Sequence, residues 1–480
     1  MSWEAVIGIE IHVQLRTATK MFCPCAVPVE GDAPNARTCP TCLGLPGALP
    51  VANRAAVEKV LAVGAAIGAT SPQTTRWDRK NYFYPDLPKG YQISQLDLPL
   101  AEHGQIAVTT SGGPRTVRIR RAHLEEDTAR LRHERRADGA RASLVDYNRS
   151  GIALLEIVTE PDIRDAETAR RYAEELRLLL RTIGAADAEM ENGQMRVEAN
   201  VSLRPSSDAP FGVRVEVKNM NSFRSVVRAL EFEIARQTEV LNAGGRIVQE
   251  TRGWVDDKAI TVSQRSKEEA NDYRYFPEPD LPPVITTAVE VDRIRARLPE
   301  MPDAKRARFA ADYGVTADVA ETLAQSRSLA NWFEEVARLS GNPRNAANWV
   351  VRDIMRILSA TGGEVDSLKI GPGHLAELIR LIDNGTISVR TAPEVLEEAV
   401  AHGTMPAEIV QARGLGQVSD TDALAAAVAE AVAANPKAVA DYRAGKATAM
   451  GFLVGAVMKA TRGKGNPGLV NELLKRQLDG

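Results

Sequence analysis

The chain has 480 residues, of which 44% are hydrophobic and 26% are charged, so it can bury a substantial core and is predicted to form two to four domains. A formal net charge of -3 excludes a uniformly basic nucleic-acid-binding protein and leaves that role to local patches. The sequence lacks a run of about 18 apolar residues and a signal-peptide pattern at MSWEAVIGIE, and it holds only 4 cysteines, so we expect a cytoplasmic protein without a membrane span.

Five segments in the N-terminal region predict strands, in which successive side chains point to opposite faces. Polar and apolar residues alternate along them, except in GIALLEIVTE, where Glu156 stands within an apolar run. The five segments are VIGIEIHVQL (6–15), VRIRRAHLEED (117–127), GIALLEIVTE (151–160), MRVEANVSL (195–203) and GVRVEVKN (212–219). In the first segment, Ile7, Ile9 and Ile11 form an apolar face, whereas Glu10 and His12 lie on the opposite face. Helical spacing over 166–184 and 225–245 adds helices, so we predict an α+β fold with a mainly antiparallel sheet.

The composition changes after residue 291, where Ala, Leu, Arg and Glu recur at helical spacing. The preceding run YRYFPEPDLPPV (273–284) contains four prolines, and no regular element is expected within it. Helices are expected to begin at MPDAKRARFA and NPRNAANWVVRDIMRIL. We therefore predict an N-terminal domain over 1–291, an all-helical domain over 292–405 and a small helical tail domain over 406–480.

The last part of the tail, Asn435 to Gly480, is basic: eight Lys or Arg oppose three Asp or Glu, a local net charge of +5. The basic residues are Lys437, Arg443, Lys446, Lys459, Arg462, Lys464, Lys475 and Arg476. This charge is typical either of a solvated helical face or of a surface that contacts phosphates. The turn TRGKGNPG favours the second interpretation, because it would present backbone N–H groups and Lys464 to a phosphate.

All four cysteines lie in one short loop, with Cys23 and Cys25 separated by thirteen residues from Cys39 and Cys42. Two close cysteine pairs that bound a loop can converge as four thiolates around a tetrahedral Zn²⁺. Such a closed site would be structural rather than catalytic, because it leaves no coordination position for a substrate. Free thiols are the alternative interpretation.

The polar faces of the five predicted strands carry a carboxylate each. These are Glu10, Glu125, Glu156, Glu198 and Glu216, and His12 lies two positions from Glu10. The ordinary explanation is the solvated face of an antiparallel sheet. Against it, Glu156 stands among apolar neighbours, where an unpaired charge is costly. A divalent cation would satisfy several of these groups, and oxygen ligands favour Mg²⁺ over Zn²⁺. Arg149, Arg196 and Lys218 are the candidate cations for phosphate contacts.

Familiar nucleotide and hydrolase motifs are missing from the sequence. There is no GxxxxGK[ST] loop and no GxGxxG after a predicted strand, so a nucleotide is not expected in a P-loop or Rossmann crevice. There is also no GxSxG elbow or convincing Ser-His-Asp order. The residues alone predict a Mg²⁺-dependent enzyme that acts through carboxylates on a sheet and has a basic, RNA-facing tail.

Long motifs throughout the chain resemble those of the GatB family, the B subunits of the heterotrimeric tRNA-dependent amidotransferase GatCAB. They are GIEIHVQLRTATKMFCPC, CPTCLGLPGALPVAN, RKNYFYPDLPKGYQISQ, HLEED, VDYNRSGIALLEIVTEPDI, GQMRVEANVSLRP, VEVKNMNSF, QETRGW, DYRYFPEPDLPP and, in the tail, ADYRAGKATAMGFLVGAVMKATRGKGNPGLVNELL. The resemblance spans essentially the whole chain.

This resemblance implies a ligase that converts misacylated Glu-tRNA(Gln), Asp-tRNA(Asn) or both into the amidated tRNA. GatB would use ATP to phosphorylate the side-chain carboxylate of the tRNA-bound amino acid, and ammonia channelled from the glutamine-hydrolysing amidase GatA would displace the phosphate. The small protein GatC would complete the heterotrimer. The implied fold is a catalytic cradle domain with the four-cysteine zinc loop at 23–42, then a helical domain, then a YqeY-like tail that binds tRNA.

The resemblance also assigns the candidate site. It places Glu10, His12, Glu125, Glu156, Glu198 and Glu216 around Mg²⁺. We expect Glu10, His12, Glu125, Glu156, Glu216 and Lys218 to be catalytic, and Arg149, Arg196 and Lys218 to contact ATP phosphates. One departure concerns RVEANVS, where the family commonly has RCDANVS: Val197 replaces a cysteine and Glu198 replaces an aspartate. Glu198 keeps the carboxylate of the aspartate but moves it by one methylene.

Two other classes of function compete with this one. A non-catalytic tRNA-binding scaffold would explain the basic tail and the nine arginines between Arg115 and Arg141. It would not explain inward-facing carboxylates, which repel phosphate unless a metal intervenes. A zinc-dependent hydrolase is excluded, because four thiolates leave no open position on the metal.

Overall fold

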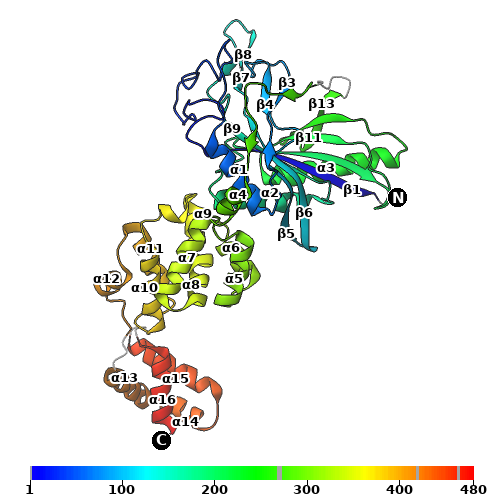
Figure 1. Cartoon of the computed structure of the whole chain (residues 1–480). Helices are drawn as coiled ribbons and strands as arrows, with labels where there is room; N and C mark the ends of the chain where they lie inside the picture. The colour runs from blue at the N-terminus through cyan, green and yellow to red at the C-terminus, as the bar shows by residue number, and fades with distance from the viewer. Residues whose placement is uncertain (1–2, 267–272, 418–420, 462–464, 480) are drawn as a thin grey trace. The chain divides into compact units, whose positions relative to one another are not determined.

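The computed structural model describes residues 3–266, 273–417, 421–461 and 465–479 (Figure 1). The chain divides into two compact units, Met1–Met301 and Pro302–Gly480. The first unit contains the described strands, and the second is built from helices. The α+β prediction is therefore confirmed.

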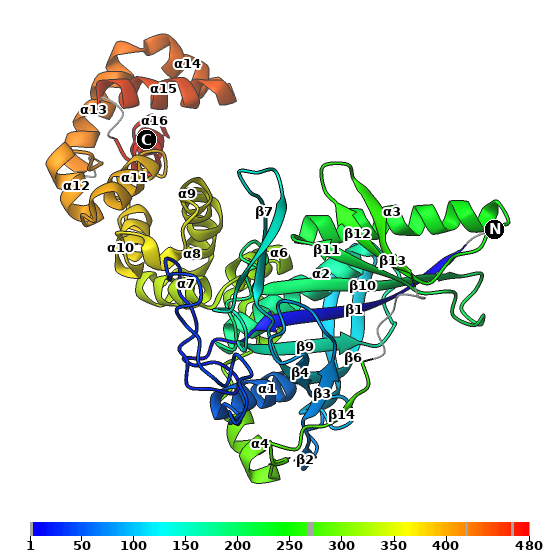
Figure 2. The same cartoon turned by 90° about the horizontal axis from the view of Figure 1, so that it is seen from above.

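An eight-stranded sheet forms the centre of the first unit, with strand β1 in its interior between β10 and β9 (Figure 2). In spatial order the strands are β13 (Ile260–Ser266), β12 (Glu250–Val255), β11 (Val215–Met220), β10 (Met195–Arg204), β1 (Glu4–Gln14), β9 (Ala153–Thr159), β6 (Gly113–Glu126) and β5 (Ala101–Thr110). Every neighbouring pair is antiparallel except β11 and β12, which are parallel. The sheet is thus mainly antiparallel, as predicted, and each of the five predicted strands is present.

Three helices pack against the sheet and bury its apolar face: α1 (Arg54–Ala66), α2 (Ala166–Thr182) and α3 (Phe223–Asn242). Each begins at a side-chain cap, from Asn53, Asp165 and Ser222 respectively, which satisfies backbone N–H groups of the first turn. Ile7 and Ile11 of β1 are completely buried in the same core. Alternation along the strand then places Glu10 and His12 on the opposite face.

Short elements lie around the sheet. They form three small sheets, β14 (Phe276–Pro277) with β3 (Asp78–Asn81) and β4 (Tyr91–Ser94), β15 (Val284–Ile285) with β2 (Thr74–Thr75), and β7 (Arg130–Arg135) with β8 (Arg141–Asp146). Strand β4 packs beside β6 and covers the part of the polar face that β6 contributes. The expectation that 273–284 holds no regular element is wrong, because β14 and β15 include residues of this run. Pro277 fits there since β14 is an edge strand.

The second unit holds two hydrophobic clusters. The helices of the first cluster are α5 (Pro302–Tyr313), α6 (Ala317–Leu323), α7 (Arg327–Ser340), α8 (Pro343–Trp349), η2 (Val350–Ile354), α9 (Met355–Thr361), η3 (Val365–Ser367), α10 (Pro372–Asp383), α11 (Ala392–His402) and α12 (Pro406–Arg413). Those of the second are α13 (Thr421–Ala434), α14 (Pro436–Arg443), α15 (Ala447–Ala460) and α16 (Pro467–Asp479). Within the described residues, no helix has the length and apolar character needed to cross a membrane.

Two helices lie close to the predicted domain boundaries. Helix α4 (Ala288–Arg295) packs on α1, so the first compact unit extends past 291 to Met301. Helix α12 buries Ile409 and Val410 in the first helical cluster, so residue 406 does not separate the two clusters. The division into three domains at 291 and 405 stays a prediction.

Candidate functional site

The polar side chains predicted on separate strands form one continuous row across the sheet. His12 of β1 lies opposite Glu156 of β9 and Arg196 of β10, and Glu10 lies opposite Glu198. His123 of β6 extends the row, because it is paired with Glu156. Directly opposite residues on neighbouring strands have side chains on the same face. The register therefore brings together groups that come from four strands of the sheet.

The first group of potential ligands consists of His12, Glu125 and Glu156, whose ligand atoms lie within 4.8 Å of one another. The Nε2 atoms of both His12 and His123 are 3.3 Å from Oε2 of Glu156. The Nε2 atom of His123 is also 3.5 Å from Oε1 of Glu125. Two carboxylates and two imidazoles thus form an unbroken series of contacts from His12 through Glu156 and His123 to Glu125, with Glu125 and His123 almost fully buried.

Strands outside the central sheet hold Glu125 in place. Its Oε1 accepts a hydrogen bond of 2.6 Å from Ser94 Oγ, and its Oε2 accepts one of 3.0 Å from Gln92 Nε2. The ammonium of Lys80 on β3 lies 3.9 Å from Oε1 of Glu125. Residues of β3 and β4 therefore neutralise and orient a carboxylate that belongs to β6.

The second group consists of Glu10, Glu198 and Glu216, which also bring their ligand atoms within 4.8 Å of one another. The Nζ atom of Lys218 is 2.8 Å from Oε2 of Glu198 and 3.4 Å from Oε1 of Glu216. Glu10 accepts a hydrogen bond of 3.0 Å from Nδ2 of Asn200. This group is less buried than the first, since 25% of the Glu216 side chain is exposed, and it is the part of the row that a ligand can reach.

The two groups differ in electrostatic balance. In the first, burial alone would raise the pKa of Glu156, but His123 and His12 hold that pKa well below its usual range. Burial alone would lower the pKa of His123, yet Glu156 and Glu125 raise it to about 9. In the second, burial and the charges of Glu156 and Glu198 raise the pKa of Glu10. The carboxylates of the first group have protein cations as partners, whereas Glu10 is in an environment with excess negative charge.

The second group fits a divalent cation better than the first. Three carboxylates at short range with the one ammonium of Lys218 retain net negative charge, which a Mg²⁺ ion bound by carboxylate oxygens would offset. In the first group the corresponding oxygens already contact Lys80, two imidazoles, an amide and a hydroxyl. Two polar atoms there lack a hydrogen-bond partner among the described residues, the buried Nδ1 atoms of His12 and His123. The six predicted magnesium ligands thus lie in two groups rather than around one common point.

The predicted phosphate-contacting residues divide in the same way. Lys218 lies in the second group, but Arg149 and Arg196 converge on the buried carboxylate of Asp127, at 3.7 and 3.2 Å. Arg149 also donates to the backbone oxygens of Thr128 and Ala129. Arg149 thus has more protein contacts than Arg196, although 30% and 36% of the two side chains are exposed.

Several residues of the site were missed as functional candidates in the sequence. His123 stands on the predicted polar face of 117–127, and that alternation was the available signal for it. Lys80 and Gln92 gave no comparable signal, because they come from four-residue strands of a separate sheet. Asn200 was recognisable only as a polar residue two positions from Glu198.

The four cysteines also converge. The Sγ atoms of Cys23, Cys25, Cys39 and Cys42 lie within 4.8 Å of one another and form no disulfide. The hydrogen bond from the Cys23 thiol, together with the nearby ammonium of Lys20, lowers the pKa of Cys42 to about 5. A cluster of four sulfurs at this range suits a tetrahedral Zn²⁺.

A buried lysine supports this fit. Lys20 is completely buried, and its Nζ lies 3.7 Å from Sγ of Cys42, 2.7 Å from the backbone oxygen of Arg37 and 3.2 Å from that of Tyr147. No carboxylate oxygen of a described residue lies within 4.0 Å of this ammonium. Because a buried charge needs a compensating one, an anionic metal–thiolate cluster is the natural counter-charge for Lys20.

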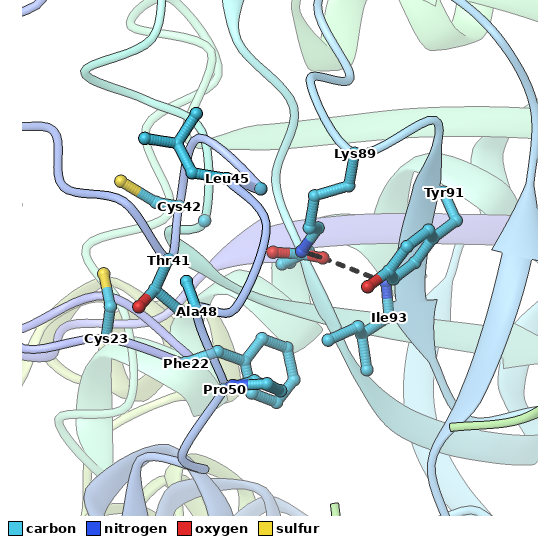
Figure 3. A pocket seen from close by; sticks show the side chains of 13 residues that line it. Phe22, Cys23, Thr41, Cys42, Leu45, Ala48, Pro50, Lys89, Tyr91 and Ile93 are labelled. Carbon is cyan, nitrogen blue, oxygen red and sulfur yellow. Dashed lines mark hydrogen bonds and ion pairs between the residues drawn. The ribbon is translucent and has the colours of Figure 1, made fainter. Parts of the chain in front are cut away.

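A cavity of about 130 Å³ lies between the cysteine loop and strand β4. In Figure 3, Cys23 and Cys42 line one side of it and Lys89 and Tyr91 the other. Lys89 forms an ion pair with Glu126, whose Oε1 also accepts a hydrogen bond of 3.0 Å from the backbone N–H of Ile93. None of the six predicted magnesium ligands lines this cavity, so it is separate from the carboxylate row.

Comparisons with known proteins cover nearly the whole chain. Residues 5–292 match the family model described as the GatB/GatE catalytic domain, and residues 331–478 match the one described as the GatB domain. The chain is 49% identical over 476 residues to the B subunit of the aspartyl/glutamyl-tRNA(Asn/Gln) amidotransferase of Carboxydothermus hydrogenoformans, with 99% of each chain covered. The proteins of the same name from Caldicellulosiruptor saccharolyticus and Moorella thermoacetica are 48% and 49% identical over 482 and 478 residues, with 100% of each chain covered.

Proposed function

The chain belongs to the GatB family, the B subunits of the aspartyl/glutamyl-tRNA amidotransferases, and from this membership we propose that it catalyses the ATP-dependent step of tRNA transamidation. The substrate would be Glu-tRNA(Gln), Asp-tRNA(Asn) or both. The partners would be the amidase GatA, which supplies ammonia, and the small protein GatC, in a heterotrimer that works in the cytoplasm.

The proposed reaction has two steps. In the first, an oxygen of the amino acid side-chain carboxylate attacks the γ-phosphorus of ATP, so that a new O–P bond forms and ADP leaves. In the second, the nitrogen of ammonia attacks the carbonyl carbon of the acyl phosphate, inorganic phosphate leaves, and loss of a proton gives the amide. Phosphorylation is needed because a free carboxylate is a poor electrophile.

The second carboxylate group is the proposed site of phosphoryl transfer. Glu10, Glu198 and Glu216 would hold Mg²⁺, and bound Mg²⁺ would neutralise charge on the phosphates. Lys218 is the nearest cation, at 2.8 Å from Glu198, and it would contact a phosphate oxygen as the transferring group gains negative charge. Without a bound cation these carboxylates would repel both ATP and the substrate carboxylate, which is the reason a metal belongs to the proposal.

The first group, His12, Glu125 and Glu156, would hold in place the side chains next to the site of phosphoryl transfer. Glu156 lies between the two imidazoles, and His12 is two residues from Glu10 on the same face of β1. The contact of His12 with Glu156 would help to hold the polar face of β1 beside Glu10. His12, Glu125 and Glu156 remain candidate ligands for a metal as well, since their ligand atoms converge.

The tail helices are the proposed tRNA-binding region. Of its eight basic residues, Lys437, Arg443, Lys446, Lys459, Lys475 and Arg476 are described, whereas Arg462 and Lys464 lie outside the described residues. Lys446 is paired with Asp441 at 2.7 Å. A basic helical surface suits the phosphate backbone of tRNA.

The single observation that carries the proposal is the convergence of Glu10 with Glu198 and Glu216 on the reachable part of the polar face. The test is Glu10→Gln in the assembled heterotrimer. We expect transamidation to fall about 10²–10³-fold, the cost of losing one preorganised charged group, while glutaminase activity is retained. Glu4→Gln is the matched control, because Glu4 is on the same strand but pairs with Arg164 and Arg204. Full transamidation by Glu10→Gln would favour the non-catalytic scaffold instead.

A further inference from the structure

Strands β7 and β8 form a hairpin that extends away from the eight-stranded sheet (Figures 1 and 2). Its outer part, from Arg135 to Arg141, is exposed throughout. Arg135, Arg136 and Arg141 lie in this short stretch, and Asp138 is its one acidic residue. The Oδ1 atom of Asp138 accepts a hydrogen bond of 3.0 Å from the backbone N–H of Ala140, so this carboxylate stabilises the turn.

The register of the hairpin places two like charges directly opposite each other. Arg135 pairs with Arg141 across the two strands, an arrangement that destabilises a hairpin by itself. In the part of the chain that the structure describes, neither guanidinium forms an ion pair with a carboxylate. On the opposite face, by contrast, Arg132 lies 3.9 Å from Glu134. The 135–141 face therefore carries positive charge that no described carboxylate neutralises.

The chemistry of this tip favours phosphates over a protein surface. Protein interfaces rely on buried aromatic or aliphatic anchors at their centre. The tip RRADGAR offers no apolar side chain larger than alanine. Arginine presents a planar fork of N–H donors that matches phosphate oxygens, so two opposed arginines would bridge successive phosphates of a nucleic-acid strand.

The root of the hairpin is held firmly. The backbone N–H of Asn35 in the cysteine loop donates to Oδ1 of Asp146 at 3.0 Å, and the backbone N–H of Tyr147 donates to Oδ1 of Asn35 at 2.7 Å. Nδ2 of Asn148 donates to the backbone oxygen of Ala33 at 2.8 Å. The folded cysteine loop thus fixes the direction in which the arginine tip projects.

We propose that the 135–141 face of the β7–β8 hairpin docks the phosphate backbone of the tRNA substrate, with the cysteine loop as its support. The proposal rests on the proposed function, which supplies the RNA, and adds a second contact surface to the tail. Loss of the 135–141 face would weaken tRNA binding without impairing the transamidation reaction.

The test compares two double variants of the assembled heterotrimer. Arg135→Gln with Arg141→Gln removes two charges from the proposed face. The matched control, Arg130→Gln with Arg132→Gln, removes two charges from the same hairpin on its other face. The probes are transcripts of tRNA(Asn) and tRNA(Gln), whose Kd is measured by fluorescence anisotropy at several salt concentrations, with thermal unfolding as the check on folding.

For the 135/141 variant we expect Kd to rise about tenfold at 0.15 M salt and the salt dependence of log Kd to flatten by about 1.5–2 units of slope. The 130/132 control should change Kd less than about twofold, within the range of an unrelated surface change. At saturating tRNA, kcat for transamidation should be unchanged in the 135/141 variant. An unchanged Kd, or an equal rise in both variants, would overturn the proposal.

Failure of GatA and GatC to co-purify with the 135/141 variant would also overturn it and identify the face as a protein interface. Failure of the proposed function is distinguishable, because it would appear as absent transamidation in the unsubstituted heterotrimer. Weakened tRNA binding with an unchanged kcat separates docking from catalysis.

Discussion

The ammonium of Lys20 points at a sulfur: its Nζ lies 3.7 Å from Sγ of Cys42 while the whole side chain is buried. The same ammonium donates to the backbone oxygens of Arg37 and Tyr147, and Tyr147 belongs to the root of the β7–β8 hairpin. Lys20 therefore links the cysteine cluster to the segment that follows the hairpin. Replacement of Lys20 therefore tests whether the cysteine cluster carries negative charge.

Replacement of Lys20 by Met should weaken zinc retention. Protein purified without chelator is expected to hold one zinc per chain, and Lys20→Met should lower zinc affinity about 10–100-fold, the usual effect of losing an outer-sphere partner of a metal site. Zinc release to a chromogenic chelator measures this directly. Lys59→Met is the control, because Lys59 also donates to a backbone oxygen, that of Gly184 at 2.6 Å, but contacts no thiol. Protein that contains no zinc would leave the cysteines as free thiols.

Replacement of His123 by Asn should impair transamidation through Glu125 and Glu156. Loss of the imidazole removes contacts of 3.5 and 3.3 Å to these carboxylates, so kcat should fall about 10–100-fold and the Mg²⁺ concentration for half-maximal activity should rise. Mg²⁺ titrations of transamidation and of glutaminase activity separate this effect from misfolding. His133→Asn is the control, because His133 is exposed, and it should leave both activities intact. A normal Mg²⁺ dependence of the His123→Asn variant would show that His123 is not part of the site.

The length of the side chain at position 198 should matter less than its charge. Glu198 contacts Lys218 at 2.8 Å and belongs to the second carboxylate group. Glu198→Asp keeps the carboxylate and should retain activity within about tenfold, whereas Glu198→Gln should lose about 10²-fold or more. Steady-state kinetics of the two variants give the comparison. Activity equal to that of the unsubstituted protein in both variants would show that the carboxylate of residue 198 has no part in the reaction.

Truncation of the tail should weaken tRNA binding only if the cut spares the preceding helices. Because α12 buries Ile409 and Val410 in the first helical cluster, deletion should begin after Gln417 rather than at 406. The truncated chain, assembled with GatA and GatC, is expected to bind tRNA at least about tenfold more weakly and with a flatter salt dependence. An unchanged Kd would make the basic tail residues a solvated helical face.

Alternation of side chains was enough to predict the strands and the face on which the carboxylates lie, because the period of two is a local property of the chain. It could not predict which carboxylates meet. That outcome depends on the pairing of β1 with β9 and β10, which brings His12 opposite Glu156 and Glu10 opposite Glu198. Which strands become neighbours depends on the packing of segments that are far apart in the sequence, so alternation within each segment could not predict that the candidate ligands lie in two groups.

Short elements limited the prediction further. Lys80, Gln92 and Ser94 neutralise or orient Glu125 from strands of four residues, and such strands have too few positions to show a period. The cysteine cluster was easier, because its members are close in sequence. Lys20 was missed since a lysine three residues before Cys23 normally faces solvent, and only the fold shows that it is buried.

The interior position of β1 also affects how the protein is made. This strand leaves the ribosome well before its partners, which span Ala153–Thr159 and Met195–Arg204. Until Thr159 has emerged, both edges of β1 remain unpaired, and the edge that faces β10 stays unpaired until Arg204 has emerged. An unpaired apolar strand is a template for aggregation. The polar face that carries the carboxylates therefore forms only after Arg204 has emerged, and translation that stalls before that point would leave a fragment that depends on chaperones for its solubility.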